Sequence, residues 1–80
     1  MRALSGRQLF LETGCGSCHV LASAGTAGTY GPDLDEAKPD HELVVLRVRW
    51  GYKAMPAFGP RLTDDEIERI ADFVVGATGG

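Results

Sequence analysis

The sequence predicts an all-α fold with three main helices separated by loops. Two capping-box patterns, Ser-x-x-Gln at Ser5 and Thr-x-x-Glu at Thr63, mark the starts of a first and a last helix, and Pro39-Asp40 opens a middle one. The 80 residues are expected to form a single domain, 1–80, and eleven glycines fit a chain with much loop. A core of this size often needs a disulfide, a metal or a cofactor for support.

The first helix is expected to begin at Ser5, its N-cap. Leu4 before the cap and Leu9 after it are spaced for a hydrophobic staple, and Gly14 is a natural stop. The i, i+3 and i+4 spacing places on one face Gly6, Leu9, Phe10 and Thr13.

The middle helix is expected to run from near Pro39-Asp40 to Trp50 and to end at Gly51. Its valines leave a strand as an alternative. Helix is favoured because Pro-Asp opens the segment, and because the basic Arg47 and Arg49 near its end suit the helix dipole.

The last helix has the clearest pattern in the chain. Thr63 is its N-cap, and Leu62 and Ile67 are spaced for a second staple. Gly76 is expected to end the helix and residues 77–80 to form a frayed tail. The apolar stripe consists of Ile67, Ile70, Ala71 and Val74, extended by Phe73.

Between the first two helices, residues 16–38 show no regular pattern apart from a possible turn at residues 15–20. The run 22–29, rich in Ala, Gly, Ser and Thr, is typical of a loop and carries no functional signature. Gly31-Pro32-Asp33 predicts a turn, and residues 55–60 contain two prolines and a glycine, which exclude a helix.

The net charge of −3 argues against nucleic acid as a partner. Acidic residues crowd the last helix and basic residues the middle of the chain, which makes either two solvated faces or a dipole that orients the protein. No stretch is long and apolar enough to span a membrane, and the first residues do not resemble a signal peptide.

Residues 15–19 form a C-x-x-C-H run. The thiols of Cys15 and Cys18 are spaced to add to the two vinyl groups of one porphyrin, and His19 then places an imidazole beneath the iron. This pattern indicates one covalent haem c. Three alternatives compete: a zinc site, which needs two more Cys or His ligands; a thioredoxin-like pair, which needs a β-α-β frame; and two structural cysteines beside a surface histidine.

Met55 is the candidate for the second iron ligand. Apart from Met1 it is the only methionine, and it lies in a proline-containing loop between two helices. A thioether is a soft ligand that raises the reduction potential. The alternatives are that Met55 fills the core, or that His41 is the ligand; His41, between Asp40 and Glu42, is expected to face solvent.

These features together resemble the class I c-type cytochromes of the short bacterial kind, over nearly the whole chain. Gly6 and Phe10 match the Gly-x-x-x-aromatic pattern of that family's first helix, and Ile70 and Phe73 match an apolar and aromatic pair on its last. The resemblance implies that the two helices cross closely, which a glycine at the crossing permits.

The resemblance also implies roles around the cofactor. Cys15, Cys18 and His19 match the haem motif, and residues 31–34 match a Gly-Pro-x-Leu segment. By this resemblance, the Pro32 carbonyl should accept a hydrogen bond from the free imidazole nitrogen of His19, which fixes the ring.

Met55-Pro56 matches the family's second iron ligand. Trp50 and Tyr52 lie where the family often places donors to the haem propionates, although packing is an equal alternative for both.

The function expected from this site is transfer of single electrons between redox partner proteins through an exposed haem edge, with no small-molecule substrate and no enzymatic activity of its own. Lys53 and Arg61 flank the Met55 loop and favour a partner with an acidic patch. By resemblance, haem attachment takes place outside the cytoplasm, so a periplasmic or outer-face location is expected, with a removed signal or anchor. Membrane contact would come through a partner or that anchor.

Two other functions remain open at this level. The chain could be the haem domain of a larger oxidase or dehydrogenase, its Gly-rich end being a linker. It could also be a haem sensor or a peroxidase-like enzyme from which Met55 is displaced. Rapid carbon monoxide binding by the reduced protein would favour the latter.

Overall fold

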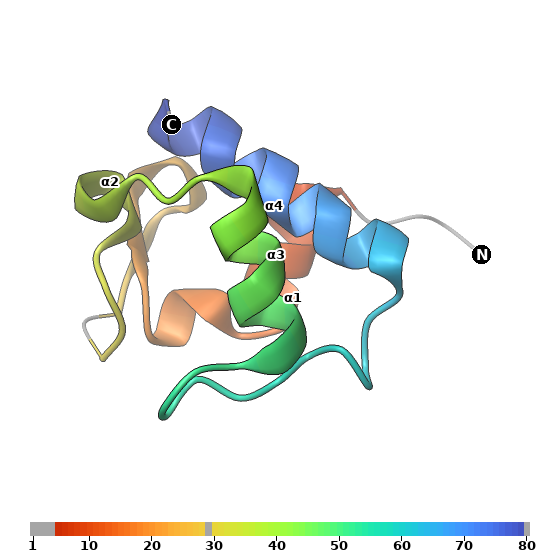
Figure 1. Ribbon diagram of the computed structural model, residues 1–80. Coiled ribbons are helices and arrows are strands. Elements are labelled where there is room, and N and C mark those ends of the chain that lie inside the picture. The colour runs from red at the N-terminus through yellow and green to blue at the C-terminus, as the bar shows by residue number, and fades with distance from the viewer. Residues whose placement is uncertain (1–4, 29, 80) are drawn as a thin grey trace.

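A computed structural model describes residues 5–28 and 30–79 of the chain. The all-α prediction is confirmed, since α1, α3 and α4 are the three main helices and the strands are two residues each. None of the helices in these two stretches has the length and apolar character needed to cross a membrane. The elements in chain order (Figure 1) are α1 (Gly6–Glu12), a 3-10 turn (Cys15–Ser17), β1 (Val20–Leu21), a second 3-10 turn (Ala22–Ala24), β2 (Thr26–Ala27), α2 (Leu34–Ala37), α3 (His41–Trp50) and α4 (Asp64–Thr78).

Both predicted capping boxes are present. The Ser5 N–H donates to Gln8 Oε1 at 2.8 Å, and Ser5 Oγ accepts from the Gln8 N–H at 3.1 Å. Thr63 and Glu66 make the same pair of bonds at 2.8 and 3.1 Å. Each box satisfies two backbone N–H groups at the start of a helix, which have no partner within the helix. Leu4, the expected staple residue of α1, lies outside the described residues.

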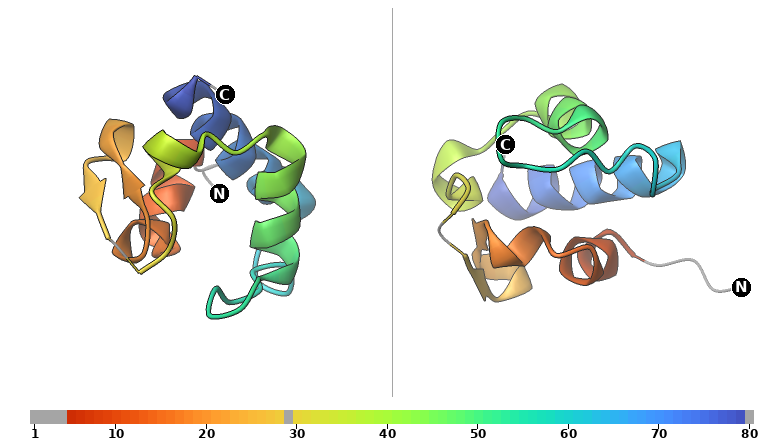
Figure 2. Two further views of the ribbon diagram at one scale, coloured as in Figure 1. Left: turned by 60° about the vertical axis from the view of Figure 1, so that its left-hand side comes forward. Right: turned by 90° about the horizontal axis from the view of Figure 1, so that it is seen from below.

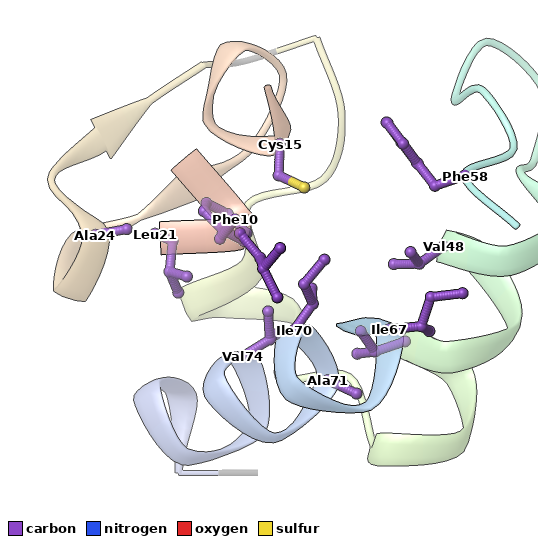
Figure 3. Packing of buried hydrophobic residues seen from close by; sticks show 12 residues of the cluster. Phe10, Cys15, Leu21, Ala24, Val48, Phe58, Ile67, Ile70, Ala71 and Val74 are labelled. Atoms are coloured by element: carbon purple, nitrogen blue, oxygen red, sulfur yellow. The ribbon is translucent and has the colours of Figure 1, made fainter. Parts of the chain in front are cut away.

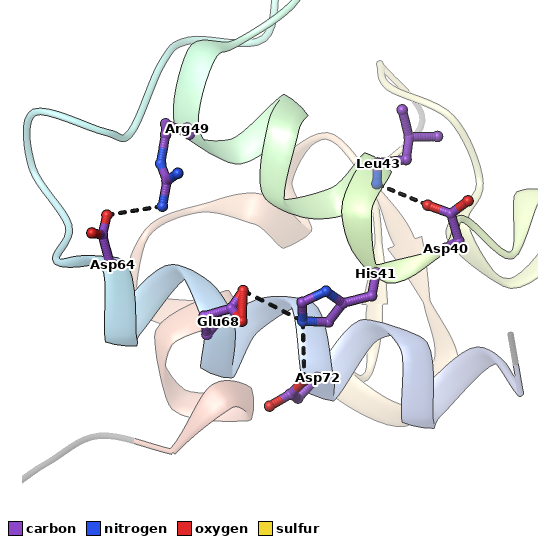
Figure 4. Close-up of polar contacts among 7 residues, drawn as sticks. All are labelled: Asp40, His41, Leu43, Arg49, Asp64, Glu68 and Asp72. Carbon is purple, nitrogen blue, oxygen red and sulfur yellow. Dashed lines mark hydrogen bonds and ion pairs between the residues drawn. The ribbon is translucent and has the colours of Figure 1, made fainter.

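The middle segment is a helix and not a strand. The Asp40 carboxylate accepts from the Leu43 N–H at 2.8 Å and starts α3 (Figure 4). Gly51, with a φ of 75°, ends it by donating its N–H to the Arg47 carbonyl at 2.8 Å. The polar cap and the closing glycine outweigh the β propensity of the valines between them.

The predicted end of the last helix at Gly76 is wrong, because α4 continues to Thr78 and stops at Gly79, whose φ is 71°. A glycine inside a helix costs about 1 kcal/mol relative to alanine. Burial of the next turn offsets this cost: Ala77 packs against the core, and the buried Thr78 hydroxyl donates to the Val74 carbonyl at 2.9 Å.

Residues 16–38, expected to lack regular structure, contain the β1–β2 hairpin and α2. The strands are antiparallel with Leu21 opposite Thr26, and Leu21 is completely buried. Asp33 caps α2 by accepting from the Glu36 N–H at 3.3 Å. Strands of two residues are too short to produce a detectable alternation of apolar and polar residues, which is why the sequence did not predict them.

The core is built around α4, which packs against both α1 and α3 (Figures 1 and 3). At the crossing with α1, a Cβ on Gly6 would collide with the Arg69 carbonyl and lie 2.8 Å from the Phe73 Cβ. The rings of Phe10 and Phe73 meet edge to face there, with centroids 5.8 Å apart. The expected close helix crossing at a glycine is confirmed.

Two segments leave this core on different sides. We call residues 13–33, of which residue 29 is not described, the cysteine segment, and residues 51–62 the Met55 loop. Figure 2 (left) shows the cysteine segment on one side and α3 with the Met55 loop on the other, while α4 runs across between them. The two segments that carry the candidate iron ligands therefore lie on different sides of the core.

Candidate haem site

The C-x-x-C-H run forms a single tight turn after α1. Gly14, with a φ of 88°, reverses the chain, and the N–H groups of Cys18 and His19 both donate to the Cys15 carbonyl, at 3.2 and 3.0 Å. Both cysteines are free thiols, Cys15 buried and Cys18 half-buried. In Figure 3 the Cys15 sulfur points toward the side of the core on which Phe58 lies.

The imidazole of His19 is held in one orientation. Its Nδ1 hydrogen-bonds the Pro32 carbonyl at 2.8 Å, which is the contact that the resemblance implied. Because a carbonyl can only accept, Nδ1 carries the proton and Nε2 keeps its lone pair. In the described part of the chain, Nε2 has no hydrogen-bond partner, which leaves that lone pair available to a metal.

Gly31 is a site residue whose role the sequence did not reveal. A Cβ there would lie 2.5 Å from His19 Cε1 and 2.9 Å from Nδ1, so only glycine lets the backbone lie against the ring. The Gly31 N–H also donates to the Cys18 carbonyl at 2.6 Å. The Gly-Pro pair was recognised as a turn, but its packing against His19 depends on two segments that are separate in the sequence.

The run 22–29, which had no functional signature, supports the C-x-x-C-H turn from behind. The Thr26 hydroxyl donates to the His19 carbonyl at 3.0 Å and accepts from the Leu21 N–H at 3.1 Å. A Cβ on Gly28 would lie 2.6 Å from the Cys18 nitrogen, so the hairpin also packs directly on the turn. The feature of the sequence that could have indicated this support is Thr26, which lies between Gly25 and Gly28.

Burial raises the pKa of the Cys15 thiol above its ordinary value, and the Thr13 hydroxyl, 3.4 Å from the sulfur, partly opposes this by lowering it. Cys15 is therefore a neutral thiol at physiological pH. A neutral apolar sulfur suits a thioether, which carries no charge and needs no solvation.

The Met55 loop begins with a strained two-residue turn. Tyr52 and Met55 exchange both backbone hydrogen bonds, at 3.1 and 2.9 Å, and Lys53 between them has a φ of 53°. A Cβ on Gly51, which precedes the turn, would lie 2.6 Å from the Met55 carbonyl oxygen. The turn thus depends on a glycine and on a left-handed residue that carries a side chain.

Further along, the Met55 loop is tied to the end of α3. The N–H groups of Phe58 and Gly59 donate to the carbonyls of Val48 and Arg49, at 2.8 and 3.1 Å. Phe58 is buried, and the half-buried Met55 packs against the same core. These contacts direct Met55 inward.

Trp50 and Tyr52 are both exposed, at 70% and 51% of their surface. Neither side chain donates a hydrogen bond within the residues that the structure describes, and neither belongs to the buried core. The Arg47 guanidinium lies 3.8 Å from the centroid of the Tyr52 ring.

His41, the alternative iron ligand, is engaged elsewhere. Its Nε2 lies 3.4 Å from a Glu68 carboxylate oxygen and 3.3 Å from one of Asp72, so it joins α3 to α4 (Figure 4). Arg49 and Asp64 make a second link between these helices at 2.8 Å. His41 was expected to face solvent. Its side chain is half-exposed and also contacts the carboxylates of Glu68 and Asp72.

These residues fit a covalently attached haem. Two free thiols on one turn, and beside them an imidazole with Nδ1 protonated and Nε2 open, form the donor set that such a group needs. Within residues 5–28 and 30–79, no group of three or more Cys, His, Asp or Glu side chains could hold a metal, which disfavours the zinc alternative. The same residues contain no β-α-β frame for a thioredoxin-like pair.

Comparison with known proteins gives a consistent result. Residues 2–74 match the family described as cytochrome c oxidase, cbb3-type, subunit III. A cytochrome c6 from Diacronema lutheri is 38% identical, with 94% of this chain and 95% of that protein covered. The cbb3-type cytochrome c oxidase subunit FixP of Rhizobium meliloti is 35% identical over 94% of this chain but only 27% of its own length.

Among solved structures, the c-type cytochrome SorU from Sinorhizobium meliloti is similar, with a TM-score of 0.86 and 47% sequence identity over 92% of this chain and 87% of that one. The family match, the relatives that are covered over most of their length, and this structure agree with the fold and the thiol and imidazole donors described above. The chain therefore belongs to the small class I c-type cytochromes, and it is an electron-carrier protein with a covalent haem c.

Proposed function

We propose that the chain carries single electrons on a haem that Cys15 and Cys18 would hold covalently and whose iron His19 and Met55 would bind. The observation that carries the proposal is the His19–Pro32 hydrogen bond of 2.8 Å, which leaves Nε2 as the free nitrogen of a fixed ring. The haem supplies the Fe(III)/Fe(II) couple.

The residues of the chain keep the change of geometry between the two oxidation states small. The Pro32 carbonyl accepts a hydrogen bond from the Nδ1–H of His19, which would hold the ring plane and make Nε2 a stronger base. Met55, held by its backbone pairing with Tyr52, offers a soft thioether that favours the reduced state. With His19 and Met55 both bound to the iron, the chain would leave no position for a small molecule.

Trp50 and Tyr52 are proposed as hydrogen-bond donors to the haem carboxylates. Their exposed rings and free donor groups support this role. Tyr52→Phe and Trp50→Phe should each lower the reduction potential relative to the unchanged protein, because a donor near a carboxylate reduces its negative field at the iron.

Absorption spectra of the oxidised and reduced protein test the ligand set. Sharp c-type bands on reduction, together with a weak far-red sulfur-to-iron band on oxidation, are expected. Met55→Ala should remove the far-red band, lower the potential and open the iron to carbon monoxide, while the matched His41→Ala should change none of these. An unchanged potential in Met55→Ala would exclude Met55 as the ligand.

The surface around the Met55 loop supports docking to a partner with an acidic patch. Lys53, Arg47 and Arg61 have no carboxylate partner among the described residues. By contrast, acidic residues of α4 are paired with Arg49, Arg69 and His41. Electron-transfer contacts are small and transient, so the second-order rate with a partner should fall as ionic strength rises. Arg61→Gln should reduce that dependence, and an unchanged salt dependence would contradict this docking surface.

A second candidate function is that of a haem domain in a larger oxidase, which is favoured by the match to about a quarter of FixP. The length of the natural reading frame decides between the two. A sensor or peroxidase-like role predicts rapid carbon monoxide binding by the unaltered reduced protein. For all of these we propose a location in the periplasm or on the outer face of the membrane, where this type of haem attachment takes place.

A further inference from the structure

The turn that presents Met55 is intrinsically unfavourable. Lys53 has a φ of 53°, in the left-handed region where a Cβ crowds the backbone, and Gly51 at 75° precedes it. Such a conformation persists only where surrounding contacts hold it. The bonds from Phe58 and Gly59 to α3 hold the far part of the loop, several residues beyond Met55.

The near part is held by Arg47, from the last turn of α3. Its carbonyl accepts the Gly51 N–H at 2.8 Å, and its guanidinium lies 3.8 Å from the Tyr52 ring centroid. Tyr52 in turn exchanges both backbone hydrogen bonds with Met55. A rigid helix is thus connected to the methionine through one stacked ring.

From these contacts we propose that Arg47 is a positioning residue for Met55, acting through the cation–π stack on Tyr52. The proposal rests on the proposed function, in which Met55 is an iron ligand. A planar guanidinium over a ring resists the displacement of Tyr52 that opening of the turn requires. Loss of the stack should leave the global fold intact and make Met55 easier to displace.

The test is imidazole binding to the oxidised, haem-loaded protein, followed by loss of the far-red sulfur-to-iron band. Arg47→Gln should tighten apparent imidazole binding about three- to tenfold, the range that corresponds to a partly exposed cation–π contact. The matched control is Arg61→Gln, which also removes one charge and one ring contact, at 4.6 Å from Phe58, and should bind imidazole as the unaltered protein does. Arg47→Lys keeps a positive charge near the ring, so its imidazole affinity should lie between those of Arg47→Gln and the unaltered protein.

Substitutions of Tyr52 separate the ring from its hydroxyl group. In imidazole binding, Tyr52→Leu should match Arg47→Gln and the double variant should add nothing further, whereas Tyr52→Phe should bind imidazole as the unaltered protein does. Thermal unfolding midpoints are measured alongside, because a merely structural role would lower the midpoint in proportion to the change in imidazole binding. If Arg47→Gln proves too unstable, Tyr52→Leu alone carries the test.

Three results would overturn the proposal: equal imidazole binding by Arg47→Gln and the unaltered protein, equal effects of Arg47→Gln and Arg61→Gln, or independent effects in the double variant. A missing far-red band in the unaltered protein would instead refute Met55 ligation itself, and the positioning role with it. The two failures are therefore distinguishable from the first spectrum.

Discussion

In the cysteine segment, glycines allow backbone and ring to pack directly on one another, whereas the Met55 loop depends on a strained turn and a stacked side chain. A Cβ on Gly31 or Gly28 would meet His19 or the Cys18 nitrogen, so the backbone is closely packed at these two points. In the Met55 loop, Lys53 has a left-handed backbone conformation and Tyr52 is half-exposed. The difference indicates that His19 is held by rigid packing, whereas Met55, the proposed second ligand, is held by contacts that can open.

The largest expected effect is the loss of covalent attachment. Replacing both Cys15 and Cys18 by alanine should leave haem that is extracted by acidified organic solvent, while Met55→Ala should retain all its haem under the same treatment. Haem staining of denaturing gels measures both. Retention of haem by the double cysteine variant would contradict the division between a permanent and an exchangeable side.

The next largest effect is expected for Gly31→Ala, which should lower the free energy of unfolding. The new Cβ would lie 2.5 Å from His19 Cε1, and overpacking of this kind typically costs 1–3 kcal/mol, about 2 kcal/mol here. Chemical denaturation of the haem-loaded protein gives the free energy of unfolding. A neutral result would mean that the cysteine segment is as adaptable as the Met55 loop.

Gly76→Ala is the same substitution as Gly31→Ala, but it is expected to stabilise the protein. Apart from its chain neighbours and the backbone of α4, no atom of the described residues lies within 4 Å of the position of its Cβ, and alanine is favoured over glycine inside a helix by about 1 kcal/mol. The variant should raise the free energy of unfolding by up to this amount and leave the reduction potential unchanged. A shifted potential would show that α4 stability is coupled to the ligands on either side.

The smallest effect is expected for His41→Ala. Its contacts with Glu68 and Asp72 are at the surface, where ion pairs contribute about 0.2–1 kcal/mol. A small loss of stability at low salt, with both ligands unaffected, is the expected outcome. Loss of the far-red band would instead mean that the α3–α4 link controls the Met55 loop.

The parts of this molecule that could be predicted from the sequence are those determined by nearby residues. The boxes at Ser5 and Thr63 involve contacts three residues apart and were correctly predicted, and so was the start of the middle helix at Pro39-Asp40. The His19–Pro32 bond joins residues 13 positions apart and was expected only through the family resemblance. Spacing alone could not have supplied it.

The errors have the same origin. The end of α4 was misplaced at Gly76 because burial of Thr78 is a tertiary effect that a local rule does not include. The hairpin around Leu21 was missed because its strands are too short for periodicity, and its support of Cys18 arises only when Gly28 packs on the turn. Local patterns predicted where these helices start and where α3 ends, whereas packing decided where α4 ends.

The contact of Gly6 with Arg69 joins the two ends of the chain and so closes a loop of roughly 60 residues, at an entropic cost of about 4 kcal/mol. Because this crossing is the most distant contact in sequence among those described above, it is the step that should limit the folding rate. A Gly6→Val chain should therefore fold more slowly, even where each helix forms readily by itself. Ribosomal synthesis has the same consequence: α1 lacks its α4 partner until residues 64–78 have been made.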